Sequence, residues 1–342
     1  PLAILPSARL PSPTRPPIPA PPMPSRSLVL PCLAVLAAAC SEPAPDVPAG
    51  EGRPTEATSL LGEPLPRPEI TGETQATYEA NLEEARAERE ANPDDADTWI
   101  WVGRRLAYLG RYGEAIDVFS EGSERWPDDP RFLRHRGHRY ITVRDLEAAE
   151  GDLEEAWALI EAAGTPDRVE PDGLPNARGI PVSTLHSNIR YHLALARYLQ
   201  GDFQGAAEAW TADVEAAVNP DMRVASSYWL WLTLSRLGRD EAAARVLEPI
   251  DPGMDIIENT AYHRLLLLFR GDLEASDLPG SGENALQNTT TAYGVAAWHL
   301  VNGRGEEATE MFDAIVSGGG PWAAFGYIAA EAERARSVSG GD

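Results

Sequence analysis

An internal repeat limits the folds open to this chain more than any other feature of its sequence. The tripeptide Pro-Asp-Asp begins at Pro93 and again at Pro127, a spacing of 34 residues. Self-similarity at a period of roughly 20 to 50 residues is typical of proteins built from stacked supersecondary units. One such unit cannot bury its own apolar face, so neighbouring units must pack against each other. We therefore expect a stack of similar units.

The residues between the two copies indicate what the unit is. Large apolar, small and turn-forming residues follow one another there in a fixed order: Trp99, Val102, Gly103, Leu106, Gly110, Tyr112, Ala115, Phe119, Gly122 and Pro127. This order resembles the tetratricopeptide repeat, a pair of antiparallel helices. Gly103 and Ala115 are small where the two helices would cross, and Gly110 would turn the chain. The resemblance implies an all-α, tetratricopeptide-type α-solenoid with a concave groove that binds a protein or peptide.

Weaker copies of the unit continue along the chain. We expect helix pairs over 130–163, 187–220, 224–250 and 289–318, a single helix over 257–271, an opening helix over 74–91 and a closing helix over 321–336. In the first of these pairs Arg144 replaces the turn glycine. We find no alternation of apolar and polar residues bounded by turn residues, so the predicted class is all-α. The solenoid is placed at 72–336 and a disordered tail at 337–342.

An insertion interrupts the repeats at 164–184. It contains several Pro and Gly residues and is longer than usual connections between helices. Two interpretations stay open, a passive surface loop, which we prefer, and a lid or docking loop.

The N-terminal 39 residues have the features of a leader and an export signal. A Pro-rich stretch precedes Met23, and an apolar run at 28–39, too short to span a bilayer, ends in small residues. The sequence Leu36-Ala37-Ala38-Ala39-Cys40 resembles the lipobox of bacterial lipoprotein signal peptides. The resemblance implies a lipid on Cys40, with an ordinary secretory signal as the alternative. Because Ser41 rather than Asp follows, it also implies an outer-membrane lipoprotein facing the periplasm of the bacterial cell envelope.

Residues 40–71 combine Pro, Gly and acidic residues with few apolar ones. Such a segment cannot bury enough surface to fold alone, so we predict a disordered, lipid-anchored linker. The lipid is the only membrane contact that we expect.

Charge and motifs narrow the functional classes. The chain has 53 acidic and 29 basic residues and a net charge of −24, which argues against nucleic acid as a partner. Nucleophile, phosphate-loop and metalloprotease motifs are missing, so we predict no enzyme and no cofactor. His135 and His138 are three residues apart, but the arginines around them disfavour a metal ion. An envelope hydrolase is kept only as a remote alternative.

The resemblance also suggests which side chains face the groove. In this family the second, fifth, ninth and twelfth positions of each first helix point inward. These positions hold a group of tyrosines and a group of polar or basic residues: Tyr191, Tyr228, Tyr262, Tyr293, Asn188, Arg104, Arg131, Arg134 and His138. Tyrosine is enriched in binding hot spots, but these rings could equally pack between repeats. The basic group suits an anionic partner segment or pairing with acids such as Asp128 and Asp129.

Two kinds of binding function remain. The first is a scaffold that binds a protein or peptide partner within an envelope complex. The second is a lipoprotein that captures a small ligand such as a glycan or a short peptide.

Overall fold

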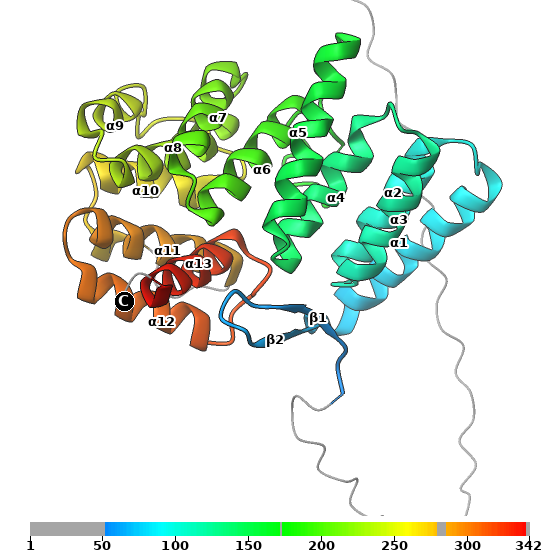
Figure 1. The fold of residues 1–342 in the computed structure, drawn as a ribbon, viewed down its shortest axis with the longest axis horizontal. Helices are drawn as coiled ribbons and strands as arrows, with labels where there is room; N and C mark the ends of the chain where they lie inside the picture. The colour runs from blue at the N-terminus through cyan, green and yellow to red at the C-terminus, as the bar shows by residue number, and fades with distance from the viewer. Residues whose placement is uncertain (1–51, 172, 279–284, 340–342) are drawn as a thin grey trace, which may run out of the picture. The chain divides into compact units, whose positions relative to one another are not determined.

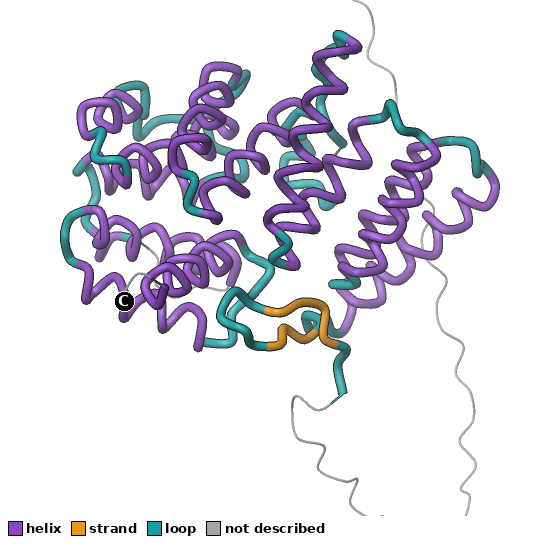
Figure 2. Tube along the Cα trace, viewed as in Figure 1, coloured by secondary structure: helices purple, strands orange, loops and turns teal. Residues whose placement is uncertain are grey.

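Thirteen α-helices account for most of the residues that the computed structural model describes, which are 52–171, 173–278 and 285–339. The predicted leader, Cys40 and the first part of the linker lie outside the described residues. Figures 1 and 2 show the helices following one another along the chain, with two short strands before them.

The helices form antiparallel pairs in chain order. Their bounds are α1 (Gly72–Ala91), α2 (Ala96–Tyr108), α3 (Tyr112–Arg125), α4 (Pro130–Val143), α5 (Leu146–Ala163), α6 (Leu185–Gln200), α7 (Phe203–Ala216), α8 (Pro220–Arg236), α9 (Asp240–Leu247), α10 (Thr260–Arg270), α11 (Ala285–Val301), α12 (Gly305–Ser317) and α13 (Phe325–Ser339). Most helices pack mainly against a neighbour in the chain, and the first helices of successive pairs also touch, most extensively α8 with α10. The predicted all-α solenoid of tetratricopeptide-type helix pairs is confirmed.

Local chemistry explains why the repeat is visible in the sequence. The last Asp of each Pro-Asp-Asp tripeptide caps a first helix: Asp95 accepts the backbone N–H of Asp97, and Asp129 accepts that of Arg131. Within the first pair, a Cβ at residue 103 would overlap the ring of Phe119, so only glycine lets α2 and α3 approach this closely. The repeat in the sequence therefore reflects the Asp residue that caps a first helix and the close crossing of α2 and α3 at Gly103.

The end of the chain meets the inner side of the middle repeats. The helix α10 has no second helix of its own among the described residues and is followed by a short 3-10 turn, η1 (Ala275–Asp277). Then α11 packs against α8, and α13 packs against α6. Figure 1 shows these last helices beside the green helices of the middle repeats. The last helix extends to Ser339, beyond the predicted boundary at 336.

Residues 53–70 correct the prediction of a disordered linker through residue 71. They form an antiparallel hairpin of β1 (Thr55–Thr58) and β2 (Pro64–Pro66), which also adds two short strands to a chain expected to have none. The hairpin is ordered by distant partners. The Glu56 carboxylate accepts the backbone N–H of Tyr112 at 2.9 Å, at the start of α3, and Trp322 Nε1 donates to the Pro66 carbonyl at 2.9 Å. Composition alone underestimated this segment because its stabilising contacts come from other parts of the chain.

None of the helices in the described part of the chain is long and apolar enough to cross a membrane.

Candidate binding pocket

A cavity of about 550 Å³, hereafter the inner pocket, lies on the inner side of the first helices α4, α6, α8 and α10. Residues 182–183 of the insertion, Asp213 on α7, residues 323–324 before α13, and Phe325 at the start of that helix add to its wall. Its volume is within the range of about 300 to 1,000 Å³ that is usual for ligand pockets. The inner side is therefore a walled pocket at this point, where the family resemblance suggested an open groove.

One wall of the inner pocket is aromatic and hydrogen-bonded. The Tyr191 hydroxyl on α6 accepts a hydrogen bond from Trp229 Nε1 at 2.8 Å and lies 3.2 Å from the Tyr262 hydroxyl on α10. Burial raises the pKa of Tyr191 well above its usual value, and the neighbouring Tyr262 adds to this. Both phenols are thus neutral at physiological pH and present an apolar ring with a polar tip.

Histidine and phenylalanine rings continue this wall, since the Tyr191 ring also lies 5.6 Å from His192 and 6.2 Å from Phe325. The His138 ring lies 4.2 Å from the His192 ring, and Phe325 packs against both, with ring centroids 5.4 and 5.7 Å away. His192 Nδ1 donates to the backbone carbonyl of Asn188, so Nε2 is left as an acceptor in the neutral ring. Burial and the nearby Arg134 guanidinium lower the pKa of His192 to about 3. These imidazoles are therefore neutral hydrogen-bonding groups near pH 7.

The insertion supplies a counter-charge and is held across several helices. Glu170 forms an ion pair with Arg134 at 2.8 Å and accepts a hydrogen bond from Asn188. Further along, the Pro171 carbonyl accepts from Arg104 at 2.8 Å, and the Val182 carbonyl accepts from the side-chain amide of Asn219, the residue before α8, at 2.9 Å. The sequence left open whether the insertion is a passive surface loop or a lid or docking loop. In the structure the insertion contacts several helices, and its residues 182–183 form part of the pocket wall.

Asp213 on α7 is the most perturbed carboxyl at the inner pocket. Only 2% of its surface is exposed. One oxygen accepts from the Ser226 hydroxyl at 2.6 Å, and the other has no hydrogen-bond partner. Burial raises the pKa of Asp213 to about 6, partly offset by the hydrogen bond from Ser226.

Five of the predicted groove residues line the inner pocket together: Arg134, His138, Asn188, Tyr191 and Tyr262. They come from three different repeats that the family's inward positions bring to one place. Arg104 lies in an adjoining smaller cavity. Arg131 lies at the start of α4 and pairs with Asp129 and Asp97, as the pairing alternative described.

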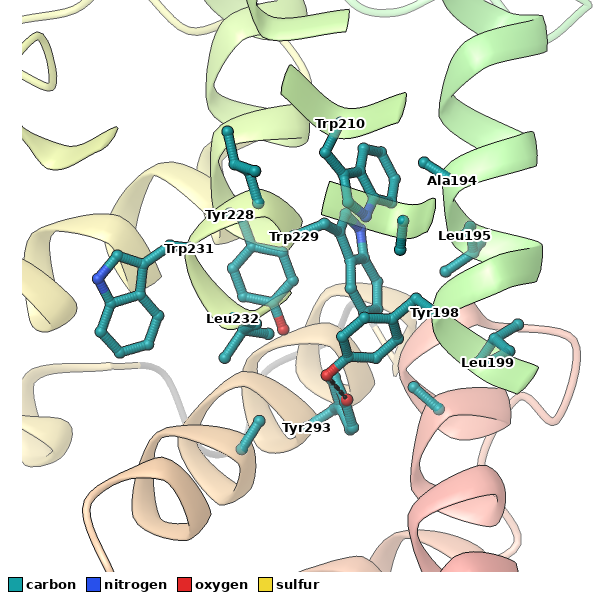
Figure 3. Packing of buried hydrophobic residues seen from close by; sticks show 14 of the residues in the cluster. Ala194, Leu195, Tyr198, Leu199, Trp210, Tyr228, Trp229, Trp231, Leu232 and Tyr293 are labelled. Carbon is teal, nitrogen blue, oxygen red and sulfur yellow. Dashed lines mark hydrogen bonds between the residues drawn. The ribbon is translucent and has the colours of Figure 1, made fainter. Parts of the chain in front are cut away.

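Tyr228 and Tyr293 are fully buried in the core rather than exposed to the pocket. Figure 3 shows the hydroxyls of Tyr293 on α11 and Tyr198 on α6 facing each other, and their oxygens are 2.8 Å apart. The Tyr228 ring packs 5.0 Å from Trp229 and 4.8 Å from Tyr262. The packing of α11 against α8 buries Tyr293, whereas Tyr228 is buried among aromatic rings of α8 and α10.

Several pocket residues carried no sequence signal of their role. Asp213 lies on a second helix, which the family pattern assigns to the outer side, and Phe325 belongs to the closing helix. Glu170, which does not line the pocket but pairs with its residue Arg134, is one acid among many in the insertion. His192 could have been noticed as a polar neighbour of Tyr191. No group of three His, Cys, Asp or Glu residues that could hold a metal ion occurs in the described ranges.

Comparisons with known proteins give only two distant structural resemblances. No family model and no curated protein matches this chain. The crystal structure of YrrB, described as a tetratricopeptide protein with an unusual peptide-binding site, aligns with a TM-score of 0.39 and 14% identity over 74% of this chain and 99% of that one. Naa15/Naa10 bound to HypK-THB aligns with a TM-score of 0.34 and 17% identity over 71% of this chain and 35% of that one. The fold assignment rests on the helix pairing itself.

Proposed function

We propose that this protein binds a peptide segment of a protein partner in the inner pocket. The observation that carries the proposal is a walled pocket on the inner side of a repeat solenoid, with aromatic rings and neutral hydrogen-bonding groups around it. Rings with polar tips are the side chains that dominate peptide and protein recognition. A pocket of this volume receives a few side chains, so the recognised segment is short.

A variant that fills the pocket tests this proposal without removing a hydrogen bond. Ala261 lines the pocket, whereas Ala244 is an exposed residue on α9 away from it. A displayed random-peptide library is panned against the full chain, and selected peptides are titrated against Ala261→Phe and Ala244→Phe. We expect the first variant to lose binding and the second to retain it. Equal binding by both variants would place the peptides elsewhere and refute the proposal.

A second candidate function is the capture of a small ligand such as a glycan. The favouring observation is that the insertion and Phe325 add side walls to the pocket, which suits a compact ligand better than a long chain. A thermal-shift screen with sugars and short peptides separates the two candidates, since a bound ligand stabilises the folded state. A saturable shift with a sugar, and none with any peptide, favours capture of a small ligand.

The location of the protein is a separate part of the proposal. We infer from the lipobox resemblance at Cys40 that the chain is a lipid-anchored envelope protein on the periplasmic side of the outer membrane. Several acyl chains on one residue would make membrane attachment nearly permanent. Cys40→Ala is expected to move the protein from the membrane fraction to the soluble periplasmic fraction. Unchanged partitioning would contradict the anchor.

A further inference from the structure

A second, smaller cavity adjoins the inner pocket. It has a volume of about 140 Å³, lies between α2 and α4, and is called the arginine cavity here. Three arginines line it, together with Tyr108 and two histidines: Arg104, Arg134, Arg139, Tyr108, His135 and His138. Arg134 and His138 line the inner pocket as well, so the two cavities share a wall.

The positive charge of the arginine cavity is only partly compensated. Arg134 pairs with Glu170 at 2.8 Å. Arg104 donates to the carbonyl of Pro171 at 2.8 Å and has no carboxylate partner among the described residues. Arg139 forms neither a hydrogen bond nor an ion pair with any residue that the structure describes, and its guanidinium lies 5.6 Å from the ring of Tyr112. Three guanidinium groups thus face one carboxylate.

This excess is unusual for so acidic a chain. Arg136, on the same helix as Arg139, forms two hydrogen bonds to the Asp152 carboxylate at 2.7 and 2.8 Å. With 53 acidic residues available, the lack of a carboxylate partner for Arg104 and Arg139, both of which are half-buried, is not explained by a shortage of acids. Burial, followed by repulsion from Arg134 and Arg104, lowers the pKa of Arg139 to about 10. Burial and Arg139 likewise hold the pKa of His138 well below its usual range.

We propose that the arginine cavity binds an oxyanion, a carboxylate or a phosphate group, carried by the ligand whose remaining part occupies the inner pocket. The planar guanidinium fork matches the two oxygens of such a group and donates charge-assisted hydrogen bonds to it. Arg139 supplies donors that no described residue uses, and Arg104 supplies a second charge. The identity of the ligand rests on the proposed function, but the anion site is testable by itself.

The test uses the full chain with inorganic phosphate and with acetate as probes. Thermal unfolding and calorimetric titration are compared with sodium chloride at equal ionic strength, which removes general screening. We expect one of the two anions to raise the melting temperature more than chloride does. Acetate alone indicates a carboxylate ligand, and phosphate alone indicates a phosphate ligand. If neither anion binds above the chloride control, the inference is overturned.

Two substitutions test whether anions bind in the arginine cavity or respond only to the overall charge of the protein. Arg139→Gln is expected to weaken anion binding roughly tenfold or more, because a hydrogen bond to a charged group is lost. Arg245→Gln on the exposed face of α9 removes the same charge far from the cavity and is expected to leave binding unchanged. Anion binding that persists in Arg139→Gln, or falls equally in Arg245→Gln, refutes the assignment.

Stability in chloride alone gives an independent readout. Since Arg139 is repelled by its neighbours and bonds to none of the described residues, Arg139→Gln is expected to melt at or above the wild-type temperature. If it melts several degrees lower, Arg139 has a structural role and the proposal is overturned. Failure of this variant to fold counts as the same outcome, and Arg104→Gln, which is also expected to weaken anion binding, is a second test of the site in the same titrations. Loss of peptide binding in Ala261→Phe without any anion effect would refute only this inference and leave the proposed function standing.

Discussion

The turn after α4 allows a direct test of whether a buried ion pair outweighs backbone strain. Other repeat turns hold glycine with φ between 66 and 87°, whereas Arg144 occupies this turn with φ 70°. Its guanidinium donates to both carboxylate oxygens of Glu331 on α13 at 2.9 Å each, and to the Trp322 carbonyl at 2.8 Å. The two charged side chains are 3% and 1% exposed. The side chain therefore holds a residue in a backbone conformation that arginine disfavours.

The substitution Arg144→Gly removes both the backbone strain at this turn and the buried ion pair, and these two changes affect stability in opposite directions. It relieves left-handed backbone strain of about 1–2 kcal/mol. It also leaves Glu331 as an unpaired buried charge, which costs about 3–5 kcal/mol when a partner is removed. The difference predicts a net destabilisation of about 1–4 kcal/mol even though glycine is the residue that the repeat pattern prefers at this turn.

Urea unfolding followed by tryptophan fluorescence measures this difference. A second substitution, Glu331→Gln in the Arg144→Gly background, removes the unpaired charge and is expected to recover most of the lost stability. A double-mutant cycle on the pair gives the coupling energy directly. If Arg144→Gly is as stable as the wild type or more so, the buried pair does not outweigh the backbone strain and the reasoning is refuted.

Three further outcomes are expected. Gly122→Ala is expected to destabilise the protein by about 1–3 kcal/mol, because the new methyl group would overlap an aromatic ring on α4. Gly151→Ala, on the open face of α5, is instead expected to stabilise the protein by about 0.5–1 kcal/mol. Urea unfolding measures both changes. The pKa of Asp213 is raised in the folded state, so the buried charge destabilises the protein increasingly as pH rises from about 4 to 6. Asp213→Asn is therefore expected to be as stable as the wild type near pH 4 and more stable by about 2–3 kcal/mol above pH 6.5. A stability difference that stays constant across this pH window would contradict the prediction. Tyr293→Phe leaves the buried Tyr198 hydroxyl without its partner and is expected to cost about 1–2 kcal/mol, with unchanged stability as the opposing result.

The helix pairs could be predicted from the sequence because their signals are local. The Asp caps, the close crossing at Gly103 and the 34-residue spacing all act within one repeat or its neighbour. The same repeat pattern also determines which positions of each first helix point inward. That is why residues as far apart as Arg134 and Tyr262 were expected on one face and do line one pocket.

Tertiary packing alone decided how much of that face is accessible and what closes it. The Arg144–Glu331 pair joins residues 187 positions apart, and the hairpin becomes ordered against α3 and the segment before α13. Such contacts depend on the small rotation between successive repeats, which accumulates over the whole stack and has no signature in any one of them. The sequence therefore determined the repeat unit and the side that it presents, whereas the path of the complete chain buried Tyr228 and Tyr293 and brought the insertion and Phe325 to the wall of the inner pocket.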